Sequence, residues 1–312
     1  MNISVIVPFY NEEGNLINLF TELKNSLDKL DKDYEIIFVN DGSNDNGELE
    51  VNKLIKENSS VKLISLSRNF GQTAGWSAGF DNAKGDLLIT IDADGQNDPA
   101  DIGKMIELLQ KENADIVNGW RKNRKDPFLR SLMSKTANKI VNWSMKVNIH
   151  DSGCSLRIIK KEAIKDLKLY GEMHRLLPFL LARTGNKIVE IPVNHRPRKI
   201  GKSKYGFSRI FKVLLDLVTI KFLASYSTKP IYMFGQVGFF FFFLSIISGG
   251  FIILRKLLLG GEWISPMLFV STTFFTVGVL CILLGLLAEI QVRAWYESSD
   301  KKSYQLKQLK KK

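Results

Sequence analysis

Two aspartates one residue apart carry the clearest chemical signal in this 312-residue chain. Asp92 and Asp94 follow the apolar run Leu87-Leu88-Ile89-Thr90-Ile91, and Gln96 lies two residues further on. Magnesium and manganese take oxygen ligands, and a site with few carboxylates is typically completed by phosphate oxygens. The pattern therefore predicts a Mg²⁺ or Mn²⁺ site at Asp92, Asp94 and Gln96 that holds a diphosphate.

Alternating strands and helices place these aspartates at one edge of a predicted sheet. Apolar runs predict strands at residues 3–7, 36–39, 61–66, 87–91 and 114–117, and near 188–191. Pro8 is expected to end the first strand. This alternation predicts an α/β fold with a mostly parallel, Rossmann-like sheet and flanking helices. Ligands of such sheets bind outside the carboxyl ends of the strands, where Tyr10, Asn11, Glu12 and Asp41 are also expected.

Standard nucleotide-binding motifs do not account for this edge. Pro8-Phe9-Tyr10-Asn11-Glu12 follows the first strand, where a dinucleotide fold needs Gly-x-Gly-x-x-Gly. Gly201-Lys202-Ser203 matches the end of a phosphate-binding loop, but Arg196 stands where that loop needs its first glycine. The sequence therefore argues against an ordinary NAD or ATP site.

The last third of the chain has the composition of a membrane segment. Residues 230–254 and 264–288 carry no charge, and each is long enough to cross a hydrocarbon core of about 30 Å. Residues 206–229 combine an apolar stripe with a basic one, which is typical of a helix in the membrane interface. Lysines gather in the tail, residues 289–312, and not in the linker, residues 255–263.

By the positive-inside rule, this distribution predicts that both termini lie in the cytoplasm. We therefore expect a multi-pass protein of the plasma membrane, with a cytoplasmic catalytic domain at residues 1–205 and a short outer loop between two spans. Gly249-Gly250, Gly278 and Gly285 would permit close helix packing, including a homo-oligomer formed through the spans.

The formal net charge of +12 suits nucleic acid, an anionic membrane or a phosphorylated substrate. Much of the excess lies between Arg121 and Lys221 and after Lys301, beside the predicted spans. No nucleic-acid motif accompanies it, so a nucleic-acid partner is not expected.

Several motifs in order resemble the family 2 glycosyltransferases of the GT-A fold. They are Val7-Pro8-Phe9-Tyr10-Asn11-Glu12, Asn40-Asp41-Gly42-Ser43, Asn69-Phe70-Gly71, Asp92-Ala93-Asp94-Gly95-Gln96 and Asp151-Ser152-Gly153-Cys154. Glu172-Met173-His174-Arg175 and the 198–204 segment narrow the resemblance to polyprenyl-phosphate glycosyltransferases, such as bactoprenol glucosyltransferases and dolichyl-phosphate mannose synthases. The two spans are similar to those of the bactoprenol branch.

The resemblance implies roles for individual residues. Those implied to bind the nucleotide-sugar are Pro8, Tyr10, Asn11, Glu12 and Asp41, and those implied to bind the metal are Asp92, Asp94 and Gln96. Arg121, Arg130 and Ser134 match the family's acceptor-phosphate residues, and Arg198, Ser203 and Lys204 are similarly placed candidates. Asp94 and Asp151 are the implied catalytic residues, with Asp151 as the base. A phosphate monoester has a second pKa of about 6, so Asp151 could instead only orient the acceptor.

The expected reaction is inverting transfer of a sugar from a nucleotide diphosphate-sugar to polyprenyl phosphate. UDP-glucose and undecaprenyl phosphate are the expected substrates, and mannose, N-acetylglucosamine or an aminoarabinose derivative are alternatives. A processive polysaccharide synthase would need a Gln-x-x-Arg-Trp motif, which Gln291-Val292-Arg293-Ala294-Trp295 does not match. A non-catalytic protein that binds nucleotide-sugars or aids export of lipid-linked sugars is a further alternative, which the Asp92, Asp94 and Asp151 set disfavours.

Overall fold

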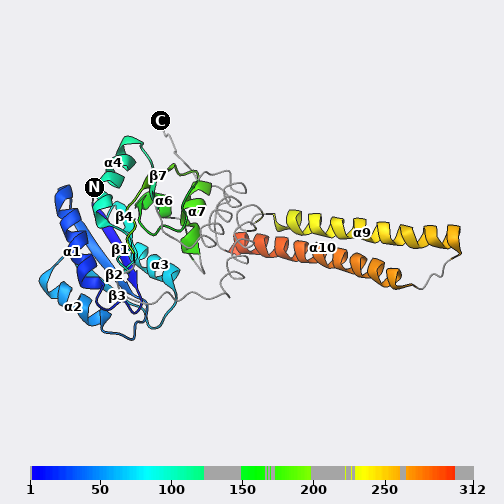
Figure 1. Cartoon of the computed structure of the whole chain (residues 1–312), viewed down its shortest axis with the longest axis horizontal. Coiled ribbons are helices and arrows are strands. Elements are labelled where there is room, and N and C mark those ends of the chain that lie inside the picture. Colours follow the sequence, from blue (N-terminus) through cyan, green and yellow to red (C-terminus); the bar gives the residue numbers. More distant parts are fainter. Residues whose placement is uncertain are drawn as a thin grey trace. The chain divides into compact units, whose positions relative to one another are not determined.

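The computed structural model describes residues 2–122, 149–165, 167, 169, 173–197, 222, 226, 229–260 and 265–298. The chain divides into two units, Met1–Asp216 and Leu217–Lys312 (Figure 1). Several predicted features lie outside the described residues: Arg130, Ser134, Arg198, Ser203, Lys204 and most of the interfacial helix at residues 206–229.

The first unit is built on a seven-stranded sheet with the order β3-β2-β1-β4-β6-β5-β7. Its strands are β1 (Ile3–Phe9), β2 (Tyr34–Asn40), β3 (Val61–Ser65), β4 (Leu87–Thr90), β5 (Ile116–Trp120), β6 (Arg157–Lys160) and β7 (Ile188–Pro192). Of the strands that the structure describes, only β6 runs antiparallel to its neighbours, which are β4 and β5. All other pairs in this sheet are parallel. The prediction of a mostly parallel α/β sheet is therefore confirmed.

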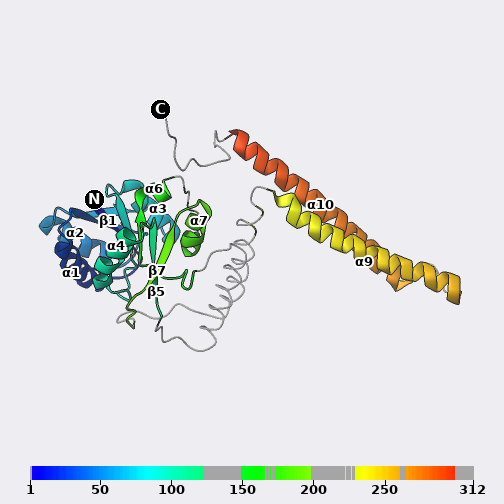
Figure 2. The same cartoon turned by 90° about the horizontal axis from the view of Figure 1, so that it is seen from above.

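Helices cover both faces of this sheet. They are α1 (Leu16–Leu27), η1 (Asp28–Leu30), α2 (Gly47–Glu57), α3 (Gln72–Asn82), η2 (Pro99–Asp101), α4 (Ile102–Lys111), α6 (Lys161–Ile164), η3 (Met173–Leu176) and α7 (Leu177–Arg183). Successive strand residues point to opposite faces, so Val5 and Val7 join a cluster with α1, α2 and α4, whereas Ile6 joins one with α3, α6 and α7. The result is a three-layer unit, which Figures 1 and 2 show from two directions.

The expectation that Pro8 ends the first strand is wrong, because β1 continues to Phe9 and Pro8 pairs in register with Val39 of β2. Neighbouring residues of a strand direct their backbone groups to opposite sides. Asp41 donates its backbone N–H to Phe9 on the β2 side, and Ile91 donates to Ile6 on the β4 side. Pro8 shares the direction of Ile6, but β4 pairs with β1 only up to Ile6. No strand that the structure describes accepts a hydrogen bond at this point, so proline, which lacks an N–H, costs the sheet nothing there.

Two long apolar helices, α9 (Pro230–Leu259) and α10 (Pro266–Ser298), lie side by side in the second unit. Both are long and apolar enough to cross a membrane. In the most apolar 18-residue stretch of each helix, only 17% of α9 and 6% of α10 is buried. A core helix of a soluble protein would be mostly buried, so lipid is the better match for these faces.

Small residues set the spacing of α9 and α10. A Cβ added at Gly278 would lie 2.8 Å from the Phe242 ring, and one added at Gly238 would lie 2.9 Å from the Gly278 carbonyl oxygen. Ser245 donates its hydroxyl to the Ser271 carbonyl oxygen at 2.9 Å. Gly278 therefore serves packing within the chain, and the homo-oligomer stays a prediction.

Candidate active site

The loops that follow β1 and β2 hold each other in place by polar contacts. Asn11, which adopts a left-handed backbone conformation with φ of 55°, donates its N–H to the Ser43 hydroxyl at 3.0 Å. Its side-chain oxygen accepts the Asn44 N–H at 2.8 Å. Glu13 and Asn46 make a second set of contacts between the same loops. The conformation of Asn11 is thus built into the edge of the sheet at which Tyr10 and Glu12 also lie.

Asp41 links this edge to the loop after β3. Its two buried carboxylate oxygens accept the backbone N–H groups of Phe70 and Gly71, at 2.7 and 2.9 Å. Gly42 has φ of 70°, and an added Cβ would lie 2.5 Å from the Arg68 backbone. Three loops therefore meet around Asp41, and Phe70 remains half exposed at their rim.

All three predicted metal ligands, Asp92, Asp94 and Gln96, lie in the segment that follows β4. Gln72, the first residue of α3, donates its side-chain amide to Asp92. Asp94 is buried, and one of its carboxylate oxygens accepts the Gln96 N–H at 3.1 Å across a turn in which Gly95 has φ of 69°. The short turn thus keeps both carboxylates at one point of the sheet edge.

Electrostatics at this point favour a bound cation. Burial and, next, the neighbouring Asp94 carboxylate raise the pKa of Asp92 to about 6, because two negative charges share a poorly solvated place. A divalent cation would remove that penalty, so the residues fit one. The described residues contain no cluster of three or more His, Cys, Asp or Glu side chains that would hold a metal alone. Oxygen atoms of water and of a ligand's phosphates would therefore complete the shell.

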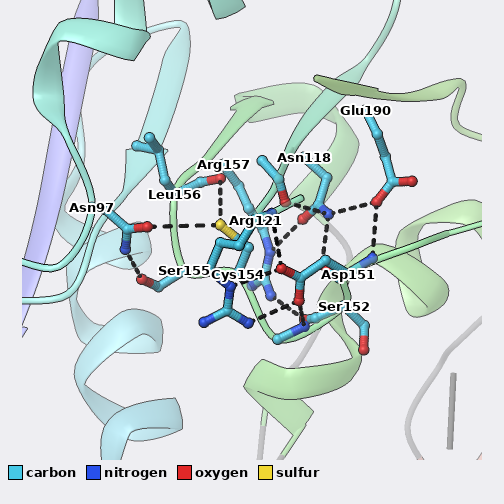
Figure 3. Close-up of polar contacts among 12 residues, drawn as sticks. Asn97, Asn118, Arg121, Asp151, Ser152, Cys154, Ser155, Leu156, Arg157 and Glu190 are labelled. Carbon is cyan, nitrogen blue, oxygen red and sulfur yellow. Dashed lines mark hydrogen bonds and ion pairs between the residues drawn. The ribbon is translucent and has the colours of Figure 1, made fainter. Parts of the chain in front are cut away.

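Asp151 and Arg121, which the resemblance assigns to the base and to the acceptor phosphate, form one bidentate ion pair (Figure 3). The Arg121 Nε and Nη2 atoms donate to the two carboxylate oxygens of Asp151 at 2.7 and 2.8 Å. The backbone N–H groups of Arg121 and Gly153 also donate to this carboxylate. A Cβ at Gly153 would lie 3.1 Å from Arg121 Nη2, so glycine leaves room for the guanidinium.

The charge of Asp151 dominates the surroundings of Arg121. Burial alone would lower the pKa of Arg121, but hydrogen bonds and charge attraction from Asp151 outweigh it and hold that pKa above its ordinary value. A hydrogen bond from the Ser155 side chain and the charges of Arg157 and Arg121 partly offset the rise in the pKa of Asp92, so the segment that follows Asp151 lies near the aspartate pair.

The backbone of the Asp151 loop is fixed from β5 and β7. The Asn118 side-chain amide donates to the Asp151 carbonyl oxygen at 2.9 Å and to Glu190 at 3.1 Å. Glu190 in turn accepts the backbone N–H groups of His150 and Asp151, at 2.8 and 3.3 Å. The His150 ring contacts the same carboxylate and stacks on Trp120.

Sequence reasoning missed Asn118, Glu190 and Arg157. Arg157 is 1% exposed, which is unusual for an arginine. The available signal was its place in an otherwise apolar run, Leu156 to Ile159, where a charged residue must find buried partners. Asn118 and Glu190 carried no comparable signal, because their partners lie tens of residues away in the chain.

The contacts of His174 and Cys154 indicate structural roles for both residues. The His174 ring contacts the Thr73 hydroxyl at 2.7 Å and lies edge-on to Trp76. Burial, first of all, raises the pKa of the Cys154 thiol to about 12, and its sulfur lies 3.8 Å from the Asn97 side-chain oxygen. A thiol held in its neutral form does not act as a nucleophile.

Comparison with known proteins places the chain. Residues 4–168 match the family model described as glycosyl transferase family 2. A dodecaprenyl-phosphate galacturonate synthase of Rhizobium johnstonii is 37% identical over 99% of this chain and 93% of its own length. An undecaprenyl-phosphate 4-deoxy-4-formamido-L-arabinose transferase of Aeromonas hydrophila is 33% identical over 98% of this chain and 93% of its own.

A solved structure supports the fold. Glucosyl-3-phosphoglycerate synthase from Mycobacterium tuberculosis, crystallised with Mn²⁺ and UDP-glucose, superposes with a TM-score of 0.54 at 17% identity. The superposition covers 72% of this chain and 78% of the mycobacterial chain. At 17% identity the likeness concerns the GT-A fold alone. Because the family model matches over half of the chain and relatives align along nearly all of it, the chain belongs to glycosyl transferase family 2 and is a glycosyltransferase.

Proposed function

We propose that this glycosyltransferase moves a sugar from a nucleotide diphosphate-sugar to polyprenyl phosphate, with inversion at the anomeric carbon. One observation carries the proposal: the Asp92–Asp94 pair and the Asp151–Arg121 pair lie at the same edge of the sheet, in a chain that ends in two long apolar helices. The relatives named for dodecaprenyl and undecaprenyl phosphate align over these helices as well.

On the donor side, the loops after β1, β2 and β3 would receive the nucleoside. Asn11 and Asp41 hold these loops together, so they preorganise the pocket that Asp41 itself, with Pro8, Tyr10 and Glu12, is expected to line. Asp92 and Asp94, with Gln96, would hold a Mg²⁺ or Mn²⁺ ion, which supplies positive charge to the leaving diphosphate. The mycobacterial synthase of the same fold was crystallised with Mn²⁺, which supports a divalent ion of this kind without choosing between the two metals.

On the acceptor side, Arg121 would bind the lipid phosphate beside Asp151. Two of the Arg121 nitrogens already serve Asp151, so the carboxylate fixes the plane of the guanidinium. Four N–H donors stabilise the charged form of Asp151 and so weaken it as a proton acceptor. A phosphate monoester is largely ionised at neutral pH and needs no strong base. We therefore assign Asp151 an orienting role in place of general-base catalysis.

The proposal covers several possible sugars. The expected donor is UDP-glucose, but the relatives are named for a galacturonate and a formamido-arabinose. Galacturonate and an aminoarabinose derivative are therefore equal alternatives, beside mannose and N-acetylglucosamine. We further propose that α9 and α10 span the plasma membrane and that the first unit faces the cytoplasm, where nucleotide-sugars are made available.

A donor panel tests this function. Membranes that contain the protein are incubated with undecaprenyl phosphate and each of several labelled nucleotide-sugars, with Mn²⁺, with Mg²⁺ or with a chelator. We expect one donor to give label in the lipid phase only when a divalent ion is present. No metal-dependent lipid label from any donor would overturn the proposed activity.

A further inference from the structure

Arg157 is a fully buried cation, although arginine is a residue type that is rarely buried. Of the described residues, no carboxylate forms an ion pair with its guanidinium. Its contacts are instead to neutral oxygen atoms and an aromatic ring. Burying a charge in this way is costly unless the arrangement serves a purpose, because every N–H bond to water has been given up.

Each nitrogen of this guanidinium reaches a different segment of the chain. Nε donates to the Asn118 side-chain oxygen on β5 at 3.0 Å, and Nη2 donates to the Ser152 carbonyl oxygen at 2.6 Å. Nη1 donates to the His174 carbonyl oxygen in η3 at 3.2 Å. The Arg157 guanidinium also lies 5.2 Å from the centre of the Trp76 ring in α3. A planar fork with five donors makes these contacts together, whereas a lysine ammonium has a single nitrogen.

The sheet register places Arg157 between the two halves of the proposed site. Arg157 pairs with Thr90 of β4, the strand that leads directly to Asp92, and with Asn118 of β5. Thr90 also donates its hydroxyl to the Ser155 carbonyl oxygen at 2.6 Å. The loop that carries Asp151 is therefore attached on one side to the strand that carries the donor ligands.

Arg157 also fixes the orientation of the Asn118 side chain, which contacts the Asp151 backbone. Because Arg157 can only donate, its bond to the Asn118 oxygen fixes which way the amide of Asn118 points. The amide nitrogen is then directed at the Asp151 carbonyl oxygen and at Glu190. Figure 3 shows this chain of contacts from Arg157 through Asn118 to Asp151.

We propose that Arg157 is a positioning residue that sets the acceptor loop, residues 151–155, at a fixed place relative to the donor ligands Asp92 and Asp94. This inference rests on the proposed function. Arg157 touches neither substrate in this assignment, so its effect should fall on the transfer step and not on donor binding. Small displacements of reacting groups cost on the order of 100-fold in rate, which makes such a role measurable.

The test compares Arg157→Lys with Lys160→Gln, a control on the same strand whose ammonium pairs with Asp115 at the surface. Four quantities are measured for the full-length protein: donor dissociation constant, donor hydrolysis to water without acceptor, transfer to undecaprenyl phosphate, and melting temperature. For Arg157→Lys we expect an unchanged donor dissociation constant and a fall in transfer kcat of roughly 10- to 100-fold. Donor hydrolysis should persist, so the ratio of hydrolysis to transfer should rise.

A second variant decides the case if Arg157→Lys does not fold. Asn118→Asp keeps an acceptor for Arg157 but loses the donors to Asp151 and Glu190, so it should reproduce the same kinetic pattern. Full transfer by Asn118→Asp, or equal losses of donor binding and transfer in Arg157→Lys, would overturn the proposal. Failure of the wild-type protein to transfer any sugar would instead contradict the proposed function, so the two failures are distinguishable.

Discussion

At the scale of single residues, the site combines one unfavourable pair of charges with one favourable pair. Asp92 and Asp94 repel each other in a poorly solvated place, and the pKa of Asp92 rises to about 6. Asp151 and Arg121 attract each other through a bidentate contact. A site for a diphosphate with a divalent ion would place the ion at the first pair and the lipid phosphate at the second.

Asp92→Asn should stabilise the metal-free protein while it lowers activity. Asp92 has a pKa of about 6 when folded, against an ordinary value of 3.8, so its ionisation costs folding free energy. That cost grows as the pH rises from about 4 and is complete above about 6. In a chelator at neutral pH we therefore expect the free energy of unfolding of Asp92→Asn to exceed that of the wild type by on the order of 1 kcal/mol, measured as a higher melting temperature.

The gain should shrink as the pH falls towards 4, and Mn²⁺ should raise the melting temperature of the wild type more than that of Asp92→Asn. The matched control is Asp81→Asn, which removes an exposed carboxylate in α3. A melting temperature of Asp92→Asn below that of the wild type in chelator would contradict the proposed charge repulsion.

Arg121→Lys should weaken use of the lipid acceptor. Lysine cannot reproduce the two parallel bonds to Asp151 or the planar approach to a phosphate. We expect the KM for undecaprenyl phosphate to rise roughly tenfold, about 1.4 kcal/mol, with little change in the KM for the donor. Arg183→Lys, an exposed change at the end of α7, is the control. A rise confined to the donor KM would contradict the assignment of Arg121 to the acceptor phosphate.

At the scale of elements, β1 and α3 approach each other unusually closely. A Cβ at Gly79 of α3 would lie 2.2 Å from the Ile6 side chain, and one at Gly75 would lie 2.8 Å from Pro8. These two glycines let α3 lie flat on the strand, so that its first residue, Gln72, reaches Asp92. The packing of this helix thus sets the position of one metal ligand.

Gly79→Ala should therefore destabilise the fold, although alanine has the higher helix propensity. The new methyl group would force β1 and α3 apart, at a cost of about 1–3 kcal/mol. Gly103→Ala in α4 is the matched control, because an added Cβ there meets only Leu30 at 3.6 Å. It should be neutral or stabilising by up to about 1 kcal/mol. Thermal unfolding of both variants checks this, and equal melting temperatures would contradict it.

The elements were largely predictable, and the exceptions have physical causes. Apolar runs located β1 to β5 and β7 to within a few residues, because buried parallel strands need continuous apolar sequence. β6 was missed because Arg157 and Lys160 interrupt its apolar pattern. The position of Asp92 and Asp94 at the sheet edge was predictable because it depends only on the preceding strand. The Asp151–Arg121 pair forms because β5 and β6 pair in the sheet, although the two residues are 30 positions apart in the chain. Sequence spacing alone could not show this contact.

At the scale of the whole molecule, the chain joins a GT-A unit to a pair of apolar helices. The predicted spans, residues 230–254 and 264–288, fall almost entirely inside α9 and α10, and both helices extend beyond them. The proposed lipid acceptor would account for this combination, because a nucleotide-sugar is soluble in water and polyprenyl phosphate resides in the bilayer. The acceptor residues Arg130, Ser134, Arg198, Ser203 and Lys204 stay predictions.

The central claim is that the Asp92–Asp94 pair supports transfer of a sugar onto polyprenyl phosphate. The most direct measurement uses purified protein in liposomes with undecaprenyl phosphate, the donor identified from the panel and Mn²⁺, followed by mass spectrometry of the lipid. We predict a polyprenyl-phosphate sugar from the wild type and from Asp81→Asn, and none from Asp94→Asn or with a chelator. Equal product from Asp94→Asn and the wild type would contradict the account.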